Sequence, residues 1–265
     1  MSWDFPQPRP LPARGRGVLR KMGPGRILPA ILVLSVPFIA CTSAQAAAPC
    51  RQVTHEGARY TVCEADLSRQ TVRRNWLRPD GQPYARLSSL PEVDKTSKRK
   101  LAFAINAGMF HADLSPVGLY VEGGREVKKA NTNKGPGNFH LKPNGVFFIA
   151  RGVAGVLETN AYLKRRPASE IATQSGPMLV IDGKLHPRFI RAEASSKYRD
   201  GVGVRDGRTA TFAVSEDEVS FAQFGRFFRD VLKCRNALFL DGGSAPALYV
   251  PGQGRAGNFL PLGPM

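Results

Sequence analysis

The 265-residue sequence has few of the residues on which metal-dependent and thiol-dependent enzymes rely. It contains only four cysteines and four histidines. The cysteines lack the spacing of zinc sites, and the histidines form neither H-x-H nor H-x-x-x-H. No P-loop of the form G-x-x-x-x-G-K-[ST] occurs, and the chain lacks the βαβ alternation of doubly wound folds. These absences disfavour a zinc enzyme, a P-loop nucleotidase and a dinucleotide-binding enzyme.

Long hydrophobic runs are also scarce, and the one that stands out lies near the N-terminus. Residues 27–40 are apolar, follow a basic stretch and precede an Ala-x-Ala sequence. This length is typical of a signal peptide and short for a membrane anchor. We therefore predict a leader over residues 1–46 and one domain over residues 47–265. The mature protein would be secreted or periplasmic, without a transmembrane span.

Two alternatives for this N-terminal region remain open. Lipid attachment at Cys41 would hold the protein at the envelope, although Phe38 stands where such sites usually have leucine. Translation from Met22 instead of Met1 would give a signal peptide of ordinary length.

Acidic residues are outnumbered by basic ones. The chain has 21 Asp and Glu against 38 Lys and Arg, which gives a formal net charge of +17 at pH 7. A surplus of this size attracts polyanions. Because nucleic acid is an unnatural partner outside the cell, we expect a glycan or a sugar-phosphate polymer, with peripheral attachment to the envelope as an alternative.

The cysteines that follow the predicted leader indicate one disulfide. Cys50 and Cys63 flank a strand-like stretch with a turn signal at Glu56-Gly57. In an oxidising compartment these two are expected to pair and to fix an N-terminal hairpin. Cys234 is then left as a buried thiol between a helix and a strand.

Turn residues divide the chain into hairpin-like segments after residue 80. Asn-Gly, Asp-Gly and Gly-Gly pairs separate apolar or alternating runs, which is the pattern of β-hairpins. A capping box at Ser215 precedes an apolar face at helical spacing. We predict an α+β domain: a mixed, mostly antiparallel sheet built from successive hairpins, with a few packed helices. The expected hairpins are residues 117–127, 139–150, 178–186 and 201–214, and short helices are expected over 84–90 and 167–172.

Three strand-like runs each end in a polar residue followed by glycine. A rigid strand holds the polar group, and the glycine lets a ligand approach the backbone. We expect these ends, which are distant in the sequence, to meet in one pocket; three ordinary turns are the alternative. The three ends are Asn106-Ala107-Gly108, Gln174-Ser175-Gly176 and Asp241-Gly242-Gly243.

Five motifs in a fixed order give the chain a family resemblance. They are Asn106-Ala107-Gly108-Met109-Phe110, Pro143-Asn144-Gly145-Val146-Phe147, Gln174-Ser175-Gly176-Pro177, Arg199-Asp200-Gly201-Val202-Gly203-Val204 and Ala237-Leu238-Phe239-Leu240-Asp241-Gly242-Gly243.

This ordered set resembles the phosphodiester glycosidase family, to which a lysosomal enzyme that removes N-acetylglucosamine from a sugar phosphodiester belongs. The resemblance covers about Cys50 to Val250. It implies a mixed α+β fold and hydrolysis of a sugar-1-phosphodiester, and bacterial relatives are often exported proteins. The sequence departs from the family pattern in two places: Asp200 stands where Asn commonly follows the arginine, and Ala245 and Pro246 stand where hydroxyl residues are expected.

Hydrolysis of a glycosyl phosphodiester needs a carboxylate at the sugar carbon and donors for the phosphate. Asp241 is the expected catalytic carboxylate and Arg199 the expected phosphate clamp. Asn106 would orient a sugar hydroxyl or the water, and His186 would donate a proton to the phosphate. The structural alternatives for Asp241, Arg199 and Asn106 are an aspartate that bonds its own turn amides, a surface arginine and a strand-end amide.

Further substrate contacts are expected from the same motifs and from a Gly/Pro-rich loop. They are Gly108, Phe110, Asn138, Asn144, Gln174, Ser175, Gly176, Gly242 and Gly243. No cofactor is expected; the alternative is a hard cation, Ca²⁺ or Mg²⁺, held by Asp113, Asp241 and carbonyl oxygens.

The leading hypothesis is a secreted hydrolase that cleaves the glycosyl C–O bond of a sugar-1-phosphodiester in an envelope or extracellular glycan. A non-catalytic glycan-binding or envelope-binding module on the same scaffold is the alternative from another functional class. A secreted phosphodiesterase that cleaves P–O is a third. The identity of the sugar, the stereochemical outcome and the oligomeric state do not follow from the residues.

Overall fold

The computed structural model describes residues 49–190, 195–253 and 260–265, which belong to one compact unit, Ala46–Met265. The predicted leader, with Met22 and Cys41, lies outside the described residues. Within the described ranges, no helix is long and apolar enough to span a bilayer.

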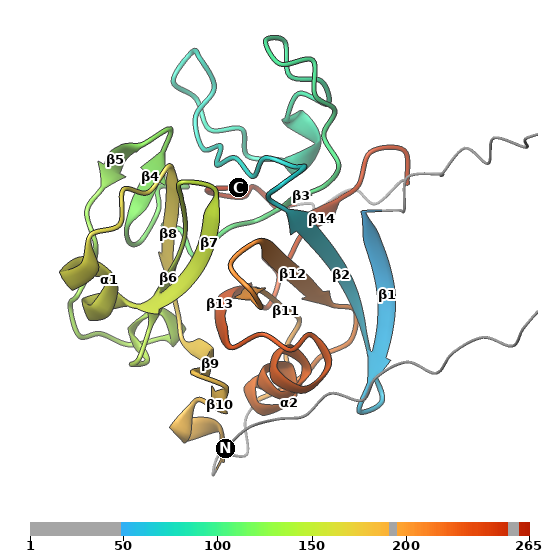
Figure 1. Cartoon of the computed structure of the whole chain (residues 1–265), viewed down its shortest axis with the longest axis vertical. Coiled ribbons are helices and arrows are strands. Elements are labelled where there is room, and N and C mark those ends of the chain that lie inside the picture. Colours follow the sequence, from blue (N-terminus) through green and yellow to red (C-terminus); the bar gives the residue numbers. More distant parts are fainter. Residues whose placement is uncertain (1–48, 191–194, 254–259) are drawn as a thin grey trace, which may run out of the picture. The chain divides into compact units, whose positions relative to one another are not determined.

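The larger of two main sheets has seven strands in the order β1-β2-β12-β11-β13-β9-β10 (Figure 1), and each neighbouring pair is antiparallel. The central strands β11 and β12 are buried at every position except Thr209, whereas the edge strand β1 has only exposed and partly buried residues. The strands are β1 (Cys50–His55), β2 (Ala58–Asp66), β9 (Met178–Ile181), β10 (Lys184–Leu185), β11 (Arg199–Val204), β12 (Thr209–Ser215) and β13 (Asn236–Gly242).

The second sheet has five antiparallel strands in the order β5-β4-β8-β6-β7, drawn in green and yellow in Figure 1. A separate two-stranded ladder joins β3 to β14. These strands are β3 (Ala104–Ile105), β4 (Tyr120–Glu122), β5 (Arg125–Lys128), β6 (Gly145–Ala150), β7 (Val153–Glu158), β8 (Ile171–Ser175) and β14 (Leu248–Tyr249).

Helices are short in the described part of the chain. The α-helices are α1 (Thr159–Arg165) and α2 (Phe221–Arg226), and α2 continues as a π-helical turn, Phe227–Val231. Three 3₁₀ turns cover Leu87–Ser89, Asn138–His140 and Pro187–Ile190. The predicted α+β class with mostly antiparallel pairing is confirmed, but the strands form two main sheets instead of one.

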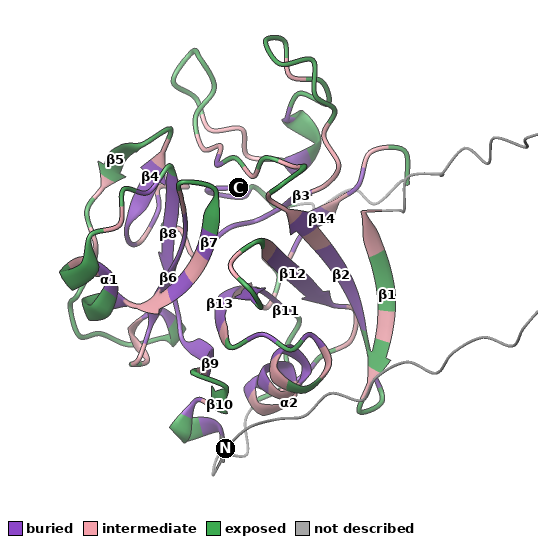
Figure 2. Cartoon of the chain, in the orientation of Figure 1, coloured by how far each residue is buried: buried purple, intermediate pink, exposed green. Residues whose placement is uncertain are grey.

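Two apolar clusters cover the two faces of the large sheet. One places Val202 and Leu238 against side chains of the second sheet, such as Phe147. The other packs the aromatic face of α2 and its π-helical turn, including Phe228, onto the opposite face. Figure 2 colours most of the strands of the large sheet, and parts of α2, as buried. A Cβ at Gly203 would lie 2.5 Å from the Cys234 sulfur, so glycine permits this close approach.

Most of the predicted hairpins form, and one does not. Residues 117–127, 178–186 and 201–214 contain the antiparallel pairs β4–β5, β9–β10 and β11–β12. The predicted hairpin 139–150 is wrong, because Asn144-Gly145 opens β6 and β6 pairs with β7 and β8 instead.

Two of the helix predictions are also corrected. The expected helix over 167–172 is wrong, because residues from Ile171 onward form β8. The capping box is not at Ser215, which ends β12 opposite Tyr60. It forms one turn later, where Ser220 accepts a hydrogen bond from the Gln223 amide.

The predicted disulfide is confirmed: Cys50 and Cys63 are directly opposite in the β1–β2 pair and are bonded. Their bridge ties the edge strand to its neighbour and fits an oxidising compartment. Cys234 is a buried free thiol, also as predicted, and burial raises its pKa to about 12.

Removing the cap of α2 is expected to destabilise the protein modestly. Ser220→Ala leaves the Gln223 amide without its side-chain acceptor, so the free energy of unfolding should fall by about 1 kcal/mol. Urea unfolding followed by circular dichroism measures this change. Ser220→Asp keeps an acceptor at the same place and should cost little; an equal loss in both variants would contradict the capping role.

Candidate active site

Several segments that are distant in the sequence meet at the ends of β8 and β13. The Thr173 hydroxyl donates to the Ala107 carbonyl oxygen at 2.7 Å, which joins β8 to the turn after β3. The Ser175 hydroxyl donates to the Leu240 carbonyl oxygen at 2.7 Å, which joins β8 to β13. The predicted convergence of the Asn106, Ser175 and Asp241 motifs is therefore present as a bonded cluster.

A β-bulge in β13 sets the direction of Asp241. Asp200 in β11 is opposite Asp241, whereas the next residue, Gly201, is opposite Phe239. Leu240 is thus the extra residue, and two residues of β13 oppose Asp200. The Asp241 amide donates to Oδ1 of Asp200 at 2.7 Å, so the bulge holds the two carboxyl residues side by side.

The two carboxyl groups have different protonation behaviour. Burial raises the pKa of Asp241 to about 6, although the Gly242 amide donates to its Oδ1 at 2.8 Å. The pKa of Asp200 is raised well above its ordinary value, first by complete burial and then by the charge of Asp241. Asp241 therefore ionises near pH 6, and Asp200 keeps its proton to a higher pH than an ordinary aspartate does.

Asn106 is bonded to the segment that follows β13. Its Oδ1 accepts a hydrogen bond from the Ala247 backbone amide at 3.2 Å, and its backbone amide donates to the Ala247 carbonyl oxygen. Its Nδ2 and the Oδ2 of Asp200 are both buried and have no partner among the described residues. A buried polar atom without a protein partner favours a ligand or ordered water at its position.

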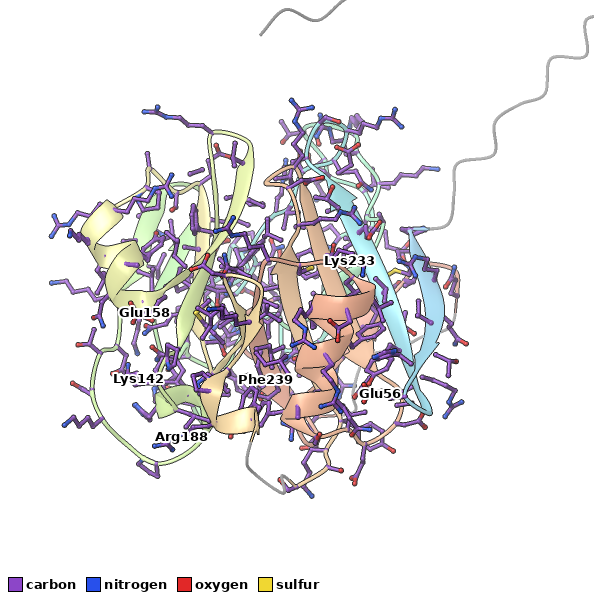
Figure 3. The ribbon with its side chains drawn as sticks, turned by 60° about the horizontal axis from the view of Figure 1, so that its bottom comes forward. Glu56, Lys142, Glu158, Arg188, Lys233 and Phe239 are labelled. Carbon is purple, nitrogen blue, oxygen red and sulfur yellow. A yellow bond between two sulfur atoms is a disulfide. The ribbon has the colours of Figure 1, made fainter. Side chains whose placement is uncertain are left out.

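Arg199 lies beside Asp200 but uses its guanidinium elsewhere. Nε donates to the Val219 carbonyl at 2.8 Å, and Nη2 donates to that of Ser195 at 2.9 Å. The group stacks 3.6 Å from the Phe221 ring centroid, on the α2 side of the sheet where Figure 3 labels Phe239. Burial lowers its pKa to about 10. This geometry favours a role in holding α2 on β11, and it does not support a phosphate clamp.

Gln174 points away from Asp241. Its neighbour Ser175 bonds to β13 beside Asp241, and successive residues of a strand face opposite sides of the sheet. The Gln174 Oε1 accepts from the Leu119 and Asn131 amides, and its Nε2 donates to the Asn131 carbonyl. These bonds occupy the amide group within the protein, so the predicted contact with phosphate oxygens is not supported.

Asn144 is a second buried structural amide. Its Nδ2 donates to the Phe139 carbonyl, and its Oδ1 accepts from Thr159 and Lys142. A Cβ at Gly176 would lie 2.5 Å from the Asn144 Cβ, so these two motifs pack directly against each other. Both residues support β8 instead of presenting free polar atoms.

His186 is buried at the end of β10, and both of its ring nitrogens have protein partners. Nδ1 accepts from the Arg188 amide at 3.2 Å, and Nε2 lies 3.1 Å from the Lys142 carbonyl oxygen. Figure 3 labels Lys142 and Arg188, which mark this position. Burial lowers the pKa of the imidazole. A neutral, fully bonded ring does not support the predicted role as proton donor.

The remaining predicted substrate contacts lie in several parts of the fold. Gly108 has φ +133° and touches β8, since a Cβ there would lie 2.9 Å from Thr173 Oγ1. Gly242 and Gly243 continue the Asp241 turn, and the Gly243 amide donates to the Tyr198 carbonyl. Phe110 packs under the C-terminal segment at Gly263. Asn138 is exposed at the start of a 3₁₀ turn.

The residues of the described ranges offer no group of three His, Cys, Asp or Glu side chains that could hold a metal ion. Asp113 is exposed, and its carboxylate accepts from the Ser115 amide. The alternative of a cation shared by Asp113 and Asp241 therefore gains no support from the geometry.

Asp200 is the functional candidate that sequence reasoning missed. Its place beside Arg199 drew attention only as a departure from the family pattern. Nothing in its residue type reveals full burial or the pairing with Asp241, because both depend on the β11–β13 register. The departure itself, a carboxyl group where an amide is common, was the usable signal.

Comparison with known proteins gives this cluster a family. The sequence model of the phosphodiester glycosidase family matches residues 99–261. The uncharacterized protein YigE of Escherichia coli K12 is 33% identical over 183 residues, covering 69% of this chain and 70% of YigE. The catalytic domain of zebrafish N-acetylglucosamine-1-phosphodiester alpha-N-acetylglucosaminidase, auto-inhibited by its pro-peptide, shares the fold with a TM-score of 0.51 at 14% identity, over 80% of this chain and 81% of that one. The chain belongs to the phosphodiester glycosidase family.

Proposed function

We propose that this protein is an exported hydrolase that cleaves the glycosyl C–O bond of a sugar-1-phosphodiester in an envelope or extracellular glycan. The observation that carries the proposal is the Asp200–Asp241 pair at the β13 bulge. Hydrolysis by a phosphodiester glycosidase, the family of this chain, needs a carboxylate at the sugar carbon. Asp241 is held rigidly at the end of β13. Export is supported by the disulfide and by the apolar segment before residue 41.

Asp241 supplies the charge in this proposal. With a pKa of about 6 it is ionised at neutral pH, yet it is basic enough to accept a proton. Its carboxylate stabilises the positive charge that develops on the anomeric carbon and accepts the proton of the attacking water. The water oxygen bonds to that carbon, and the electron pair of the broken C–O bond stays on the phosphate oxygen that leaves. A phosphate departs readily, so this step needs little acid assistance.

Asp200 acts through Asp241 as a positioning residue. Its Oδ1 accepts the Asp241 amide hydrogen, and its raised pKa disfavours a second negative charge beside the catalytic carboxylate. Asn106 is the candidate donor for a sugar hydroxyl, because its Nδ2 is unpaired within the described part of the protein.

The test is hydrolysis of a panel of sugar-1-phosphodiesters in water enriched in oxygen-18. The proposal expects the label in the released sugar, because water attacks the anomeric carbon. Label in the phosphate instead would show P–O cleavage and replace the proposal by a phosphodiesterase. Absence of turnover on the whole panel, with glycan binding retained, would favour the binding module.

A further inference from the structure

A basic cavity adjoins the candidate active site. It has a volume of about 830 Å³ and lies between residues 69–104 and strand residues that include Phe147 and Leu240. Ala107 and Thr173, which bond to each other, also line it, and Leu240 directly precedes Asp241. Six basic side chains contribute to the lining: Arg69, Arg73, Arg74, Lys95, Arg99 and Lys100.

Asp94 is the one acidic side chain in the lining among the described residues, and it is already neutralised. Its oxygens accept hydrogen bonds from the Arg73 guanidinium and from the Thr96 and Ser97 amides. These bonds, those from Ser97 first, lower the pKa of Asp94 to about 2. The cavity therefore keeps a surplus of positive charge after this pair is counted.

Arg74 is the unusual member, because it is only 4% exposed. Its Nη1 donates to the Ala107 carbonyl at 3.2 Å, and the guanidinium lies 4.5 Å from the Tyr120 ring centroid. Nε and Nη2 are buried without a hydrogen-bond partner, and Arg74 forms no ion pair, within the described ranges. Glu122 acts on it only from behind Tyr120, whose hydroxyl donates to Glu122 at 2.6 Å.

A buried guanidinium with two unpaired donors is costly, and an oxyanion with matching acceptors removes that cost. Burial lowers the pKa of Arg74, and Tyr120 and Glu122 offset only part of this shift. A paired set of N–H donors on a planar group fits the oxygens of a phosphate. The stacking against Tyr120 fixes the plane of the donors, so the site is preorganised for such a group.

We infer that this cavity is an anion-binding subsite in which Arg74 holds a phosphate-type oxyanion, and that Lys95 and Lys100 contribute charge around it. Arg74 lies before residues 99–261, the part that the family model matches. If the proposed function holds, the substrate is a glycan with an acidic group that enters the cavity beside Asp241. The assignment of the oxyanion to the substrate rests on that function; the anion site itself does not.

The test is titration of the purified protein with inorganic phosphate, followed by calorimetry at constant ionic strength. Saturable binding is expected, and glucose 1-phosphate should bind more tightly than phosphate, whereas glucose should not bind. Arg74→Gln should weaken phosphate binding by at least about tenfold, because it removes the buried charge that pairs with the anion. Arg125→Gln removes an exposed charge on β5, outside the cavity lining, and is the matched control that should bind like the wild type.

Arg74→Gln alters a buried position, so a second variant protects the test against misfolding. Lys95→Gln/Lys100→Gln changes two exposed residues of the cavity lining and should weaken phosphate binding several-fold. Wild-type protein that shows no saturable phosphate binding, or cavity variants that bind like the control, would overturn the inference.

The inference and the proposed function fail separately. Asp241→Asn should leave phosphate affinity unchanged, because Asp241 does not line the cavity. Phosphate binding without any turnover would leave the anion site standing and reject the hydrolase. Turnover together with cavity variants that change neither phosphate binding nor KM would leave the hydrolase standing and reject the anion site.

Discussion

Asp241→Asn should reduce kcat/KM on a cleaved sugar-1-phosphodiester by about 10³-fold, within the range expected for loss of a catalytic proton acceptor. The amide has nearly the same shape but carries no charge at the anomeric carbon and accepts no proton from water. The fold should survive, because an uncharged group suits a site where burial raises the pKa of the carboxyl group. Steady-state release of the sugar measures the rate, and circular dichroism verifies the fold.

Asp206→Asn is the matched control for this change, since Asp206 is an exposed turn residue that accepts hydrogen bonds from the Arg208 and Thr209 amides. It should retain wild-type turnover. Wild-type activity should also rise with pH through about 6, as Asp241 ionises. A folded Asp241→Asn protein that keeps more than a tenth of the activity would remove Asp241 from the catalytic role.

Asp200→Asn should stabilise the folded protein, and the gain should grow with pH. The pKa of Asp200 is raised in the folded state, first by burial. Above the ordinary aspartate pKa of about 4 the unfolded chain loses this proton while the folded protein still holds it, so wild-type stability falls as the pH rises through the window between the two pKa values. Asparagine never ionises, so the variant escapes that loss and its Oδ1 still accepts the Asp241 amide.

Urea unfolding of both proteins at several pH values measures the difference. Near pH 3 the two should be almost equally stable, because Asp200 is protonated in both states there. Above the unfolded-state pKa of about 4 the variant should become more stable than the wild type, and the difference should widen as the pH rises. A difference that is constant with pH, or of opposite sign, would show that Asp200 is ionised in the folded protein.

Local sequence patterns predicted much of the fold, but they did not predict the directions in which the side chains of the site point. Turn pairs with positive φ, such as Asp182-Gly183, located hairpins because the turn chemistry acts within four residues. Asn144-Gly145 misled the same rule, since its partner strand is β7 and not the preceding segment. The disulfide was predictable because it joins the two strands of one hairpin.

Residue type identified the correct motifs but not which way each side chain points. Ser175 and Gln174 are neighbours, yet one bonds to β13 beside Asp241 and the other is committed to Leu119 and Asn131. Arg199 and Asp200 differ in the same way across β11. Side-chain direction depends on register and on which sheet lies on each face, and both are set by long-range pairing that a local pattern does not contain.

The additional residue at Leu240 has a consequence for tracing the ancestry of this site. A homologue that lost one amino acid from this strand would rotate its aspartate toward the opposite layer, even though the Asp-Gly-Gly letters remained intact. Matching letters in an alignment would then imply a shared chemistry that had vanished. Insertions and deletions along this strand are therefore the better guide to which relatives keep the carboxylate in the orientation described for Asp241.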